Sequence, residues 1–193
     1  GPASLAHGSD AIAGAVNIMP ASVPPMNTVE TSISMVGKSL NNLVGGSAMV
    51  NTRGERSYVY ARYTHTDFGD YRVPTDSVFY NRYRLPIHNQ RLKNTAGRER
   101  NAHITLGAIA DWGQTSVSAS NVYGRTGFFP GSHGIPNIND LTPDGSSRGI
   151  DLPYQEANHF KVQLNTTVRF NGNQLEVDFG YQNNRRREWS RFH

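Results

Sequence analysis

The feature that most constrains this chain is a strict alternation of side chains between Phe160 and Phe170. The even positions carry apolar side chains or threonine, and the odd positions are polar throughout. A period of two places successive side chains on opposite faces of an extended strand, so the segment is predicted to be a strand with one apolar face. The alternation resumes over 175–181 after Asn171-Gly172-Asn173. This spacing predicts a hairpin closed by a short Asn-Gly turn.

Weaker versions of the pattern run through most of the chain. An apolar face recurs at every second position from Ala102 to Trp112, and a tight turn then leads into a strand over about 115–123. Further strands are predicted at about 28–37, 42–52 and 56–68. With 19 glycines and 10 prolines in the chain, the sequence predicts an all-β protein of about seven antiparallel up-and-down strands, with no helix longer than a turn.

The predicted connections alternate in length. Tight turns are expected near 51–56, 111–114 and 171–173, and long loops at about 69–98 and 125–157. Loops near 30 residues are unusual in compact domains. Short turns at one end of the strands and long loops at the other are typical of outer-membrane β-barrels. The connection at 37–42 is the exception, because it is short where a long loop is expected.

The length of the best-defined strand also suits a membrane. Ten residues span about 33 Å, which a tilt near 45° reduces to about 23 Å, close to the roughly 25 Å apolar band of such barrels. The strand at 56–68 fits poorly, because Arg62 interrupts one face while His65 and Asp67 interrupt the other. A soluble β-sandwich, whose apolar face packs on a second sheet, also explains the alternation.

Composition removes several other classes of protein. The mean hydropathy is −0.57, and no window approaches the roughly 18 consecutive apolar residues of a membrane-spanning helix. The chain has no cysteine, so disulfides, thiolate metal sites and a cysteine nucleophile are excluded.

The opening segment, GPASLAHGSDAIAGAVNI, is the most specific motif in the chain. Ser9 and Asp10 can cap a short helical turn, Gly14 permits a close approach of the backbone, and 16–18 can form a short strand. The segment resembles the end of the plug domain of TonB-dependent outer-membrane receptors, with His7 where that family commonly has tyrosine. The resemblance implies a structural role for six residues: Gly8, Ser9, Ala11, Ile12, Gly14 and Asn17.

The resemblance further implies a division into two parts. Residues 1–22 would be the C-terminal end of a plug domain, and residues 23–193 the N-terminal part of a transmembrane β-barrel, with about seven of its roughly 22 strands. The chain is then expected to be a fragment of a receptor in the bacterial outer membrane. Such receptors import a scarce nutrient, here an iron chelate, haem or cobalamin.

The resemblance also names the expected partners. A TonB-type energy transducer would act through the part of the plug that precedes this sequence. The imported nutrient is the small-molecule ligand, and outer-membrane lipid and lipopolysaccharide would surround the barrel.

In such receptors the ligand lies between the plug and the extracellular loops. The stretches at 69–98 and 125–157 and the chain from Arg185 are therefore the candidate binding regions. Arginines among aromatic side chains suit an anionic, partly aromatic ligand such as a metal chelate. A plainer interpretation is that these cations contact lipopolysaccharide phosphates or solvent. The candidate ligand-binding residues are Arg82, Tyr83, Arg84, His133 and Arg186.

Other functions find little in the sequence to support them. A net charge of +4 without a recognition motif argues against a nucleic-acid partner. The 7 histidines lack the spacing of metal ligands, and no strand-to-helix nucleophile elbow is predicted. We therefore expect neither an enzyme nor a resident metal or cofactor. A soluble β-sandwich that binds an anionic partner remains the alternative, in which the apolar faces meet a packed core instead of lipid.

Overall fold

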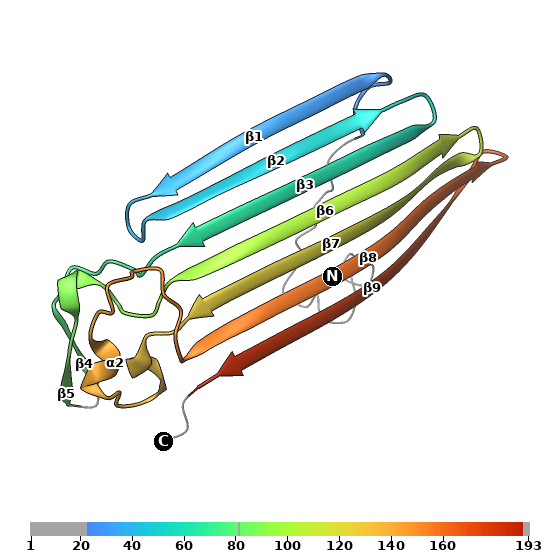
Figure 1. The fold of residues 1–193 in the computed structure, drawn as a ribbon. Coiled ribbons are helices and arrows are strands. Elements are labelled where there is room, and N and C mark those ends of the chain that lie inside the picture. Colours follow the sequence, from blue (N-terminus) through green and yellow to red (C-terminus); the bar gives the residue numbers. More distant parts are fainter. Residues whose placement is uncertain (1–22, 81, 191–193) are drawn as a thin grey trace.

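The computed structural model describes residues 23–80 and 82–190, so the motif at residues 1–22 lies outside the described residues. The described residues form an antiparallel sheet of 7 strands, in which each strand lies beside the next sheet strand along the chain (Figure 1). The prediction of an all-β, up-and-down antiparallel fold is confirmed. The sheet strands are β1 (Thr28–Lys38), β2 (Leu43–Arg53), β3 (Ser57–Phe68), β6 (Gly97–Ala110), β7 (Gly113–Gly127), β8 (Tyr154–Phe170) and β9 (Asn173–Trp189).

Two further strands form a small hairpin of their own, which the sequence analysis did not predict. They are β4 (Ser77–Tyr80) and β5 (Tyr83–Pro86). Four residues are too few to display a period-two pattern above the surrounding loop. The helical elements are equally short, namely η1 (His88–Gln90), η2 (Pro130–His133) and α2 (Ile138–Leu141). No helix in the described part of the chain has the length and hydropathy needed to cross a membrane.

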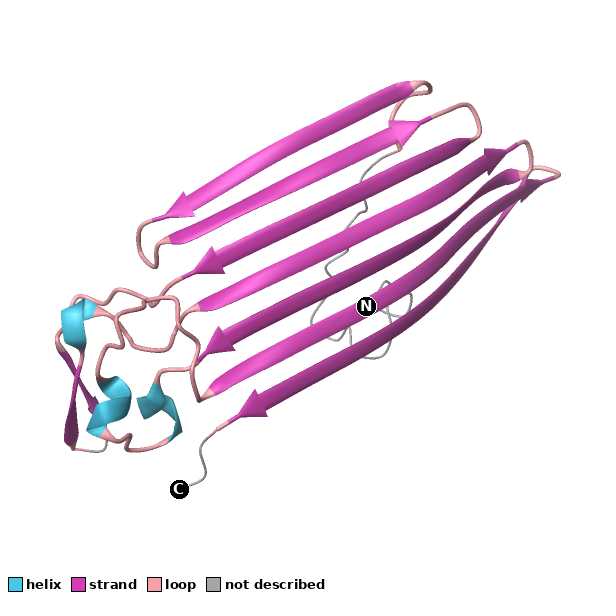
Figure 2. Cartoon of the chain, in the orientation of Figure 1, coloured by secondary structure: helices cyan, strands magenta, loops and turns pink. Residues whose placement is uncertain are grey.

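The connections differ at the two ends of the sheet (Figure 2). Short turns join β2 to β3, β6 to β7 and β8 to β9 at one end, which we call the turn end. The last of these is the predicted Asn-Gly turn, in which Asn171 and Gly172 have φ values of 47° and 75°, as a two-residue type I′ turn requires. At the other end the connections over 69–96 and 128–153 are long and fold together into a cap, while the β1–β2 turn is short.

The pairing register aligns the apolar side chains of neighbouring strands. Leu164 of β8 is paired with Val117 of β7 on one side and with Phe179 of β9 on the other. Paired residues of antiparallel strands present their side chains on the same face. Rows of this kind run across the sheet from the turn end up to the row that holds Tyr63, Ala102 and Phe160. We call these rows the apolar band, and none of its strand positions carries a charged side chain.

The register also explains the strand that fitted poorly. Arg62 lies on the face opposite the apolar band, in the row of His103 and Lys161. His65 and Asp67 share the face of the band but lie one and two rows beyond its border, toward the cap. The expected interruption of the apolar face is therefore corrected: the charges of β3 lie outside the band, because the apolar face ends before the strand does.

The opposite face of the sheet is polar along the same strands. Arg62 donates a hydrogen bond to Ser47 Oγ at 2.9 Å, and His103 Nε2 lies 2.9 Å from Thr105 Oγ1. Within the apolar band, by contrast, the Thr115 and Thr166 hydroxyl groups bond to each other at 2.8 Å. These two hydroxyl groups thus satisfy each other, as polar groups facing an apolar medium must.

Several strands are longer than predicted. Both β8 and β9 have 17 residues, and they extend well beyond the alternating segments from which they were predicted. The chain from Arg185, a candidate binding region in the sequence, continues β9 to Trp189. The cap-side ends of these strands are largely polar on both faces, so they carry no period-two hydropathy signal although the backbone hydrogen bonding continues.

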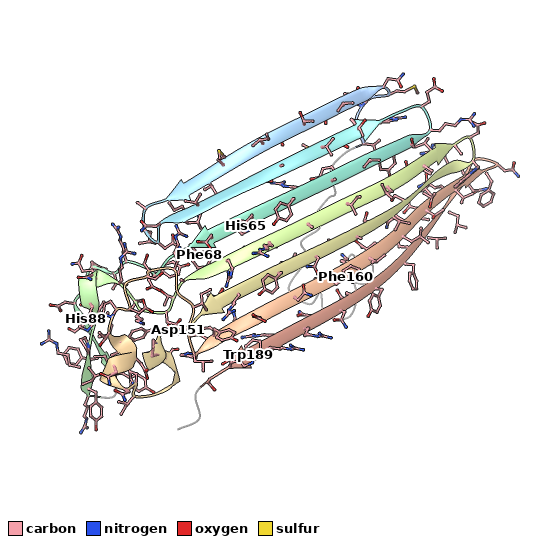
Figure 3. All side chains as sticks on the ribbon, in the orientation of Figure 1. His65, Phe68, His88, Asp151, Phe160 and Trp189 are labelled. Atoms are coloured by element: carbon pink, nitrogen blue, oxygen red, sulfur yellow. The ribbon has the colours of Figure 1, made fainter. Side chains whose placement is uncertain are left out.

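The sheet forms a single curved layer (Figure 3). Many apolar side chains of the band are exposed: Ile33 is 83%, Leu106 53% and Phe179 68% exposed. Among the described residues no second sheet covers this face. The strands β1 and β9 are the two open edges of the sheet, since within the described chain each pairs on one side only.

The apolar core of the described chain lies in the cap. Its buried side chains include Phe68, Leu85, Ile87 and Leu141. Asn94 holds the two long loops together: its Nδ2 lies 2.9 Å from the carbonyl oxygen of Phe128, and 3.1 and 2.8 Å from those of residues 151 and 153. Its Oδ1 accepts a hydrogen bond from the residue 151 amide at 2.7 Å. Asn94 is only 3% exposed, so water cannot replace these bonds.

Replacing Asn94 by alanine should loosen the cap while the sheet persists. A buried group left without its partner costs about 1–3 kcal/mol, so we expect a loss of about 3 kcal/mol in the local stability of residues 128–153. Hydrogen exchange should show this as a fall of about a hundredfold in amide protection there. Asn89→Ala is the matched control, because Asn89 also has positive φ (54°) but is exposed. Equal losses in both variants would contradict the role of Asn94.

Candidate functional site

The two long loops enclose a cleft within the cap. Its volume is about 220 Å³. The first loop contributes Asp70, Arg91 and Lys93, and the second contributes a wall of backbone and hydroxyl groups at 143–147. The loops are joined beside the cleft by a hydrogen bond from the Asp70 amide to the Ser147 carbonyl oxygen at 2.7 Å. The cleft therefore exists only when both loops are folded together.

An ion pair spans the cleft. Lys93 Nζ lies 3.0 Å from Asp144 Oδ2, and the Lys93 side chain is 17% exposed. A backbone hydrogen bond from Ser146 and the neighbouring Lys93 ammonium lower the pKa of Asp144 below its ordinary value of 3.8. Arg91 Nη1 approaches the Asp70 carbonyl oxygen at 3.4 Å. With both charge signs present, the cleft suits a small polar or zwitterionic ligand.

Asp70 is the buried carboxyl group of this site. Its Oδ1 accepts hydrogen bonds from the amides of Thr95 and Ala96 at 2.8 and 3.1 Å. Burial nevertheless raises the pKa of Asp70 above 3.8, because desolvation of the carboxylate outweighs these bonds. The group positions the start of β6 and contributes a wall of the cleft.

The predicted ligand-binding residues do not all meet at this cleft. Arg82, Tyr83 and Arg84 lie together at the tip of the β4–β5 hairpin and are exposed to solvent. Arg84 pairs with Asp76 at 3.6 Å, with both side chains largely exposed. The backbone of His133 lies in η2, in the second loop. The six plug-motif residues lie outside the described part of the chain.

Arg186 lies in β9, far along the chain from the other predicted ligand residues. It occupies the polar face of the sheet, because it is paired with Ala157 of β8. Its guanidinium lies 3.9 Å from Glu188 Oε2. Arg186 therefore lies in a regular strand of the sheet and not at the β4–β5 hairpin tip, where Arg82, Tyr83 and Arg84 lie.

The cleft lies between the two predicted binding regions, 69–98 and 125–157, but its residues were not among the candidate ligand-binding residues. Asp70, Lys93 and Asp144 are single charged residues in long loops, and more than 40 positions separate Lys93 from Asp144. Neither spacing nor periodicity could indicate that these loops fold against each other. Groups of three or more residues able to hold a metal ion are not found among the described residues.

A second cluster of charge lies on the sheet itself. The two rows beyond the cap-side border of the apolar band contain several arginines on the face of the band. We call this cluster the arginine belt. It consists of Arg98, Arg100, Arg125, Arg185 and Arg187.

An aromatic stack completes the belt at its cap-side edge. The Arg125 guanidinium lies 4.1 Å above the ring centroid of Tyr154, and Tyr154 stacks on Trp189 with centroids 4.7 Å apart and an interplanar angle of 27°. Figure 3 labels Trp189 at the cap end of β9 and Phe160 within the sheet. Cation–π contact of this kind helps to hold the Arg125 side chain against the aromatic stack.

Comparisons with known proteins add no family assignment. No protein-family model matches the chain, and no curated protein matches it.

The raised pKa of Asp70 predicts a pH dependence of the cap. The folded cap binds the proton of the Asp70 carboxyl group more tightly than the unfolded chain does. The stability that this proton gives the cap is therefore fully present below pH 3.8 and is lost as pH rises through the raised pKa. Amide protection of residues 69–96, corrected for intrinsic exchange rates, should fall in the wild type as pH rises through the raised pKa of Asp70. The same fall should be absent in Asp70→Asn.

Asp144→Asn serves as the control of opposite sign. The lowered pKa of Asp144 stabilises the cap above pH 3.8, and this contribution is lost as pH falls. An unchanged pH profile in Asp70→Asn would contradict the assignment to Asp70.

Proposed function

We propose that this chain forms part of the wall of an outer-membrane β-barrel receptor of the TonB-dependent type. The observation that carries the proposal is the apolar band: an uncharged face aligned in register over seven strands, exposed in a single layer. Exposed apolar surface in water costs about 25 cal/mol per Å², whereas in a bilayer it costs nothing. The short turns at one end and the cap at the other support the same proposal.

The dimensions of the band also support a bilayer environment. From Phe160 to Phe170 the strand rises about 33 Å, or about 23 Å along the membrane normal at a tilt near 45°. Aromatic side chains lie at both borders, with Tyr63 and Phe160 toward the cap and Trp112 and Phe170 at the turn end. Such aromatic girdles mark the two interfaces of a membrane barrel.

In this proposal the open edges of the sheet pair with further strands, because an unpaired edge cannot persist in lipid. The rest of the receptor supplies these strands in the cell, and other copies of the chain supply them when the chain alone enters vesicles. The cap would then face the exterior and contribute to capture of the nutrient. The resemblance of residues 1–18 to a plug domain supports energy-coupled uptake of an iron chelate, haem or cobalamin. The soluble sandwich would need a second sheet, which the described residues do not supply.

A charge placed in the band should separate the two environments. Leu164→Arg puts an arginine in the middle of the apolar band and should cost about 2–4 kcal/mol in a bilayer, whereas at an exposed position in water it should cost almost nothing. We expect Leu164→Arg to reduce folding of the full chain into phosphatidylcholine vesicles, measured by co-sedimentation and far-UV circular dichroism.

Gln163→Arg is the matched control, because Gln163 is adjacent in β8 but faces the polar side. It should fold into vesicles like the wild type. A chain that is compact, monomeric and folded without lipid, and indifferent to both substitutions, would contradict the membrane proposal.

The transport part of the proposal is tested in the source organism. Deleting the gene should abolish high-affinity uptake of one of three radiolabelled nutrients, namely ferric chelates, haemin or cobalamin. A protonophore should have the same effect on the intact strain, because the energy comes from the inner membrane. Identical uptake of all three nutrients with and without the gene would contradict this part.

A further inference from the structure

The arginine belt lies directly beyond the cap-side border of the apolar band and on the same face of the sheet. From this juxtaposition we infer that the belt binds the phosphate groups of anionic lipids in the membrane leaflet on the cap side. The inference rests on the proposed function, since lipid must first surround the band.

The basic charge belongs to one face of the sheet. On the face of the band, the two belt rows hold five arginines against two carboxylates, Asp67 and Glu156. The interleaved rows of the opposite face hold a single arginine, Arg186, with Glu99 in the same row. A cation serving only solubility could occupy either face, so the bias toward the lipid side requires a partner on that side.

The carboxylates within the belt are already engaged. Glu156 lies 3.7 Å from Arg125, and Asp67 pairs with Arg148 of the second loop. Within the described chain, four belt arginines form no ion pair: Arg98, Arg100, Arg185 and Arg187. Guanidinium groups bind phosphate through paired N–H donors, so a phosphate headgroup at this height would neutralise the belt.

The turn-end border of the band has no row of arginines. The inference therefore applies to only one leaflet of the membrane. At the turn end, the last rows on the same face contain Ala110, Gly113, Val168 and Leu175. No described residue in these rows is charged. Tyr154 and Trp189 lie at the belt side, and aromatic side chains of these types favour the headgroup region of a bilayer.

The test uses the full chain and phosphatidylcholine vesicles with and without phosphatidylglycerol. Trp112→Phe leaves Trp189 as the sole tryptophan, because the chain has 2, so its fluorescence reports on the belt. We expect phosphatidylglycerol to raise the vesicle partition coefficient at least about tenfold, given that one arginine near an anionic surface contributes about fivefold. The Trp189 emission should also shift to shorter wavelength.

A belt variant removes the four unpaired arginines by substitution to glutamine: Arg98→Gln, Arg100→Gln, Arg185→Gln and Arg187→Gln. It should lose the gain from phosphatidylglycerol and still fold into phosphatidylcholine. The control variant removes four cations of the polar face: Arg62→Gln, Lys161→Gln, Arg169→Gln and Arg186→Gln. Both variants reduce the net charge from +4 to 0 (4 − 4 = 0), so a difference between them reports position and not total charge.

The outcomes separate this inference from the proposed function. Failure of the wild-type chain to enter either vesicle would overturn the membrane proposal itself. Entry into both vesicles with equal affinity, or an equal loss in the belt and control variants, would overturn the lipid-phosphate assignment alone. High salt should reduce the gain from phosphatidylglycerol but not entry into phosphatidylcholine, because only the former is electrostatic.

Discussion

Unbroken antiparallel pairing is the constraint on which the other features of this structure depend. Six successive strand pairs run residue against residue, so every second side chain joins a row that crosses the sheet. A slip of one residue in any pair would carry the apolar side chains beyond it to the opposite face. The apolar band, its sharp cap-side border and the arginine belt exist as continuous features only because all six registers agree.

The cap and the sheet are stabilised by different interactions. The cap has a small buried core and a polar network centred on Asn94 and Asp70, in which donors and acceptors are matched at short distances. The sheet has its ladder of backbone hydrogen bonds but no layer that covers its apolar face among the described residues. In the proposed function a bilayer interior covers this face, because the band is uncharged and its extent along the strands fits the apolar layer of a membrane.

The extent to which the sequence predicted these features follows the same division. The strand at Phe160–Phe170 and the turn at Asn171-Gly172 were predictable, because hydropathy and backbone preference are both local there. The cap-side ends of β8 and β9 were not, because both faces become polar and the alternation disappears. Arg82, Tyr83 and Arg84 could be recognised as neighbours, whereas the cleft between the two loops could not, since its walls are distant in sequence.

What the sequence by itself determined is the side chain that each strand residue presents and the face on which it falls relative to its own neighbours. What only the tertiary structure decided is the row of the sheet, between the turn end and the cap, in which each residue lies. His65 and Asp67 read as defects in an apolar strand, but pairing with β2 and β6 places them in the rows of the arginine belt. Register is a relation between strands and not a property of one strand, so the local pattern alone could not assign these residues to a row.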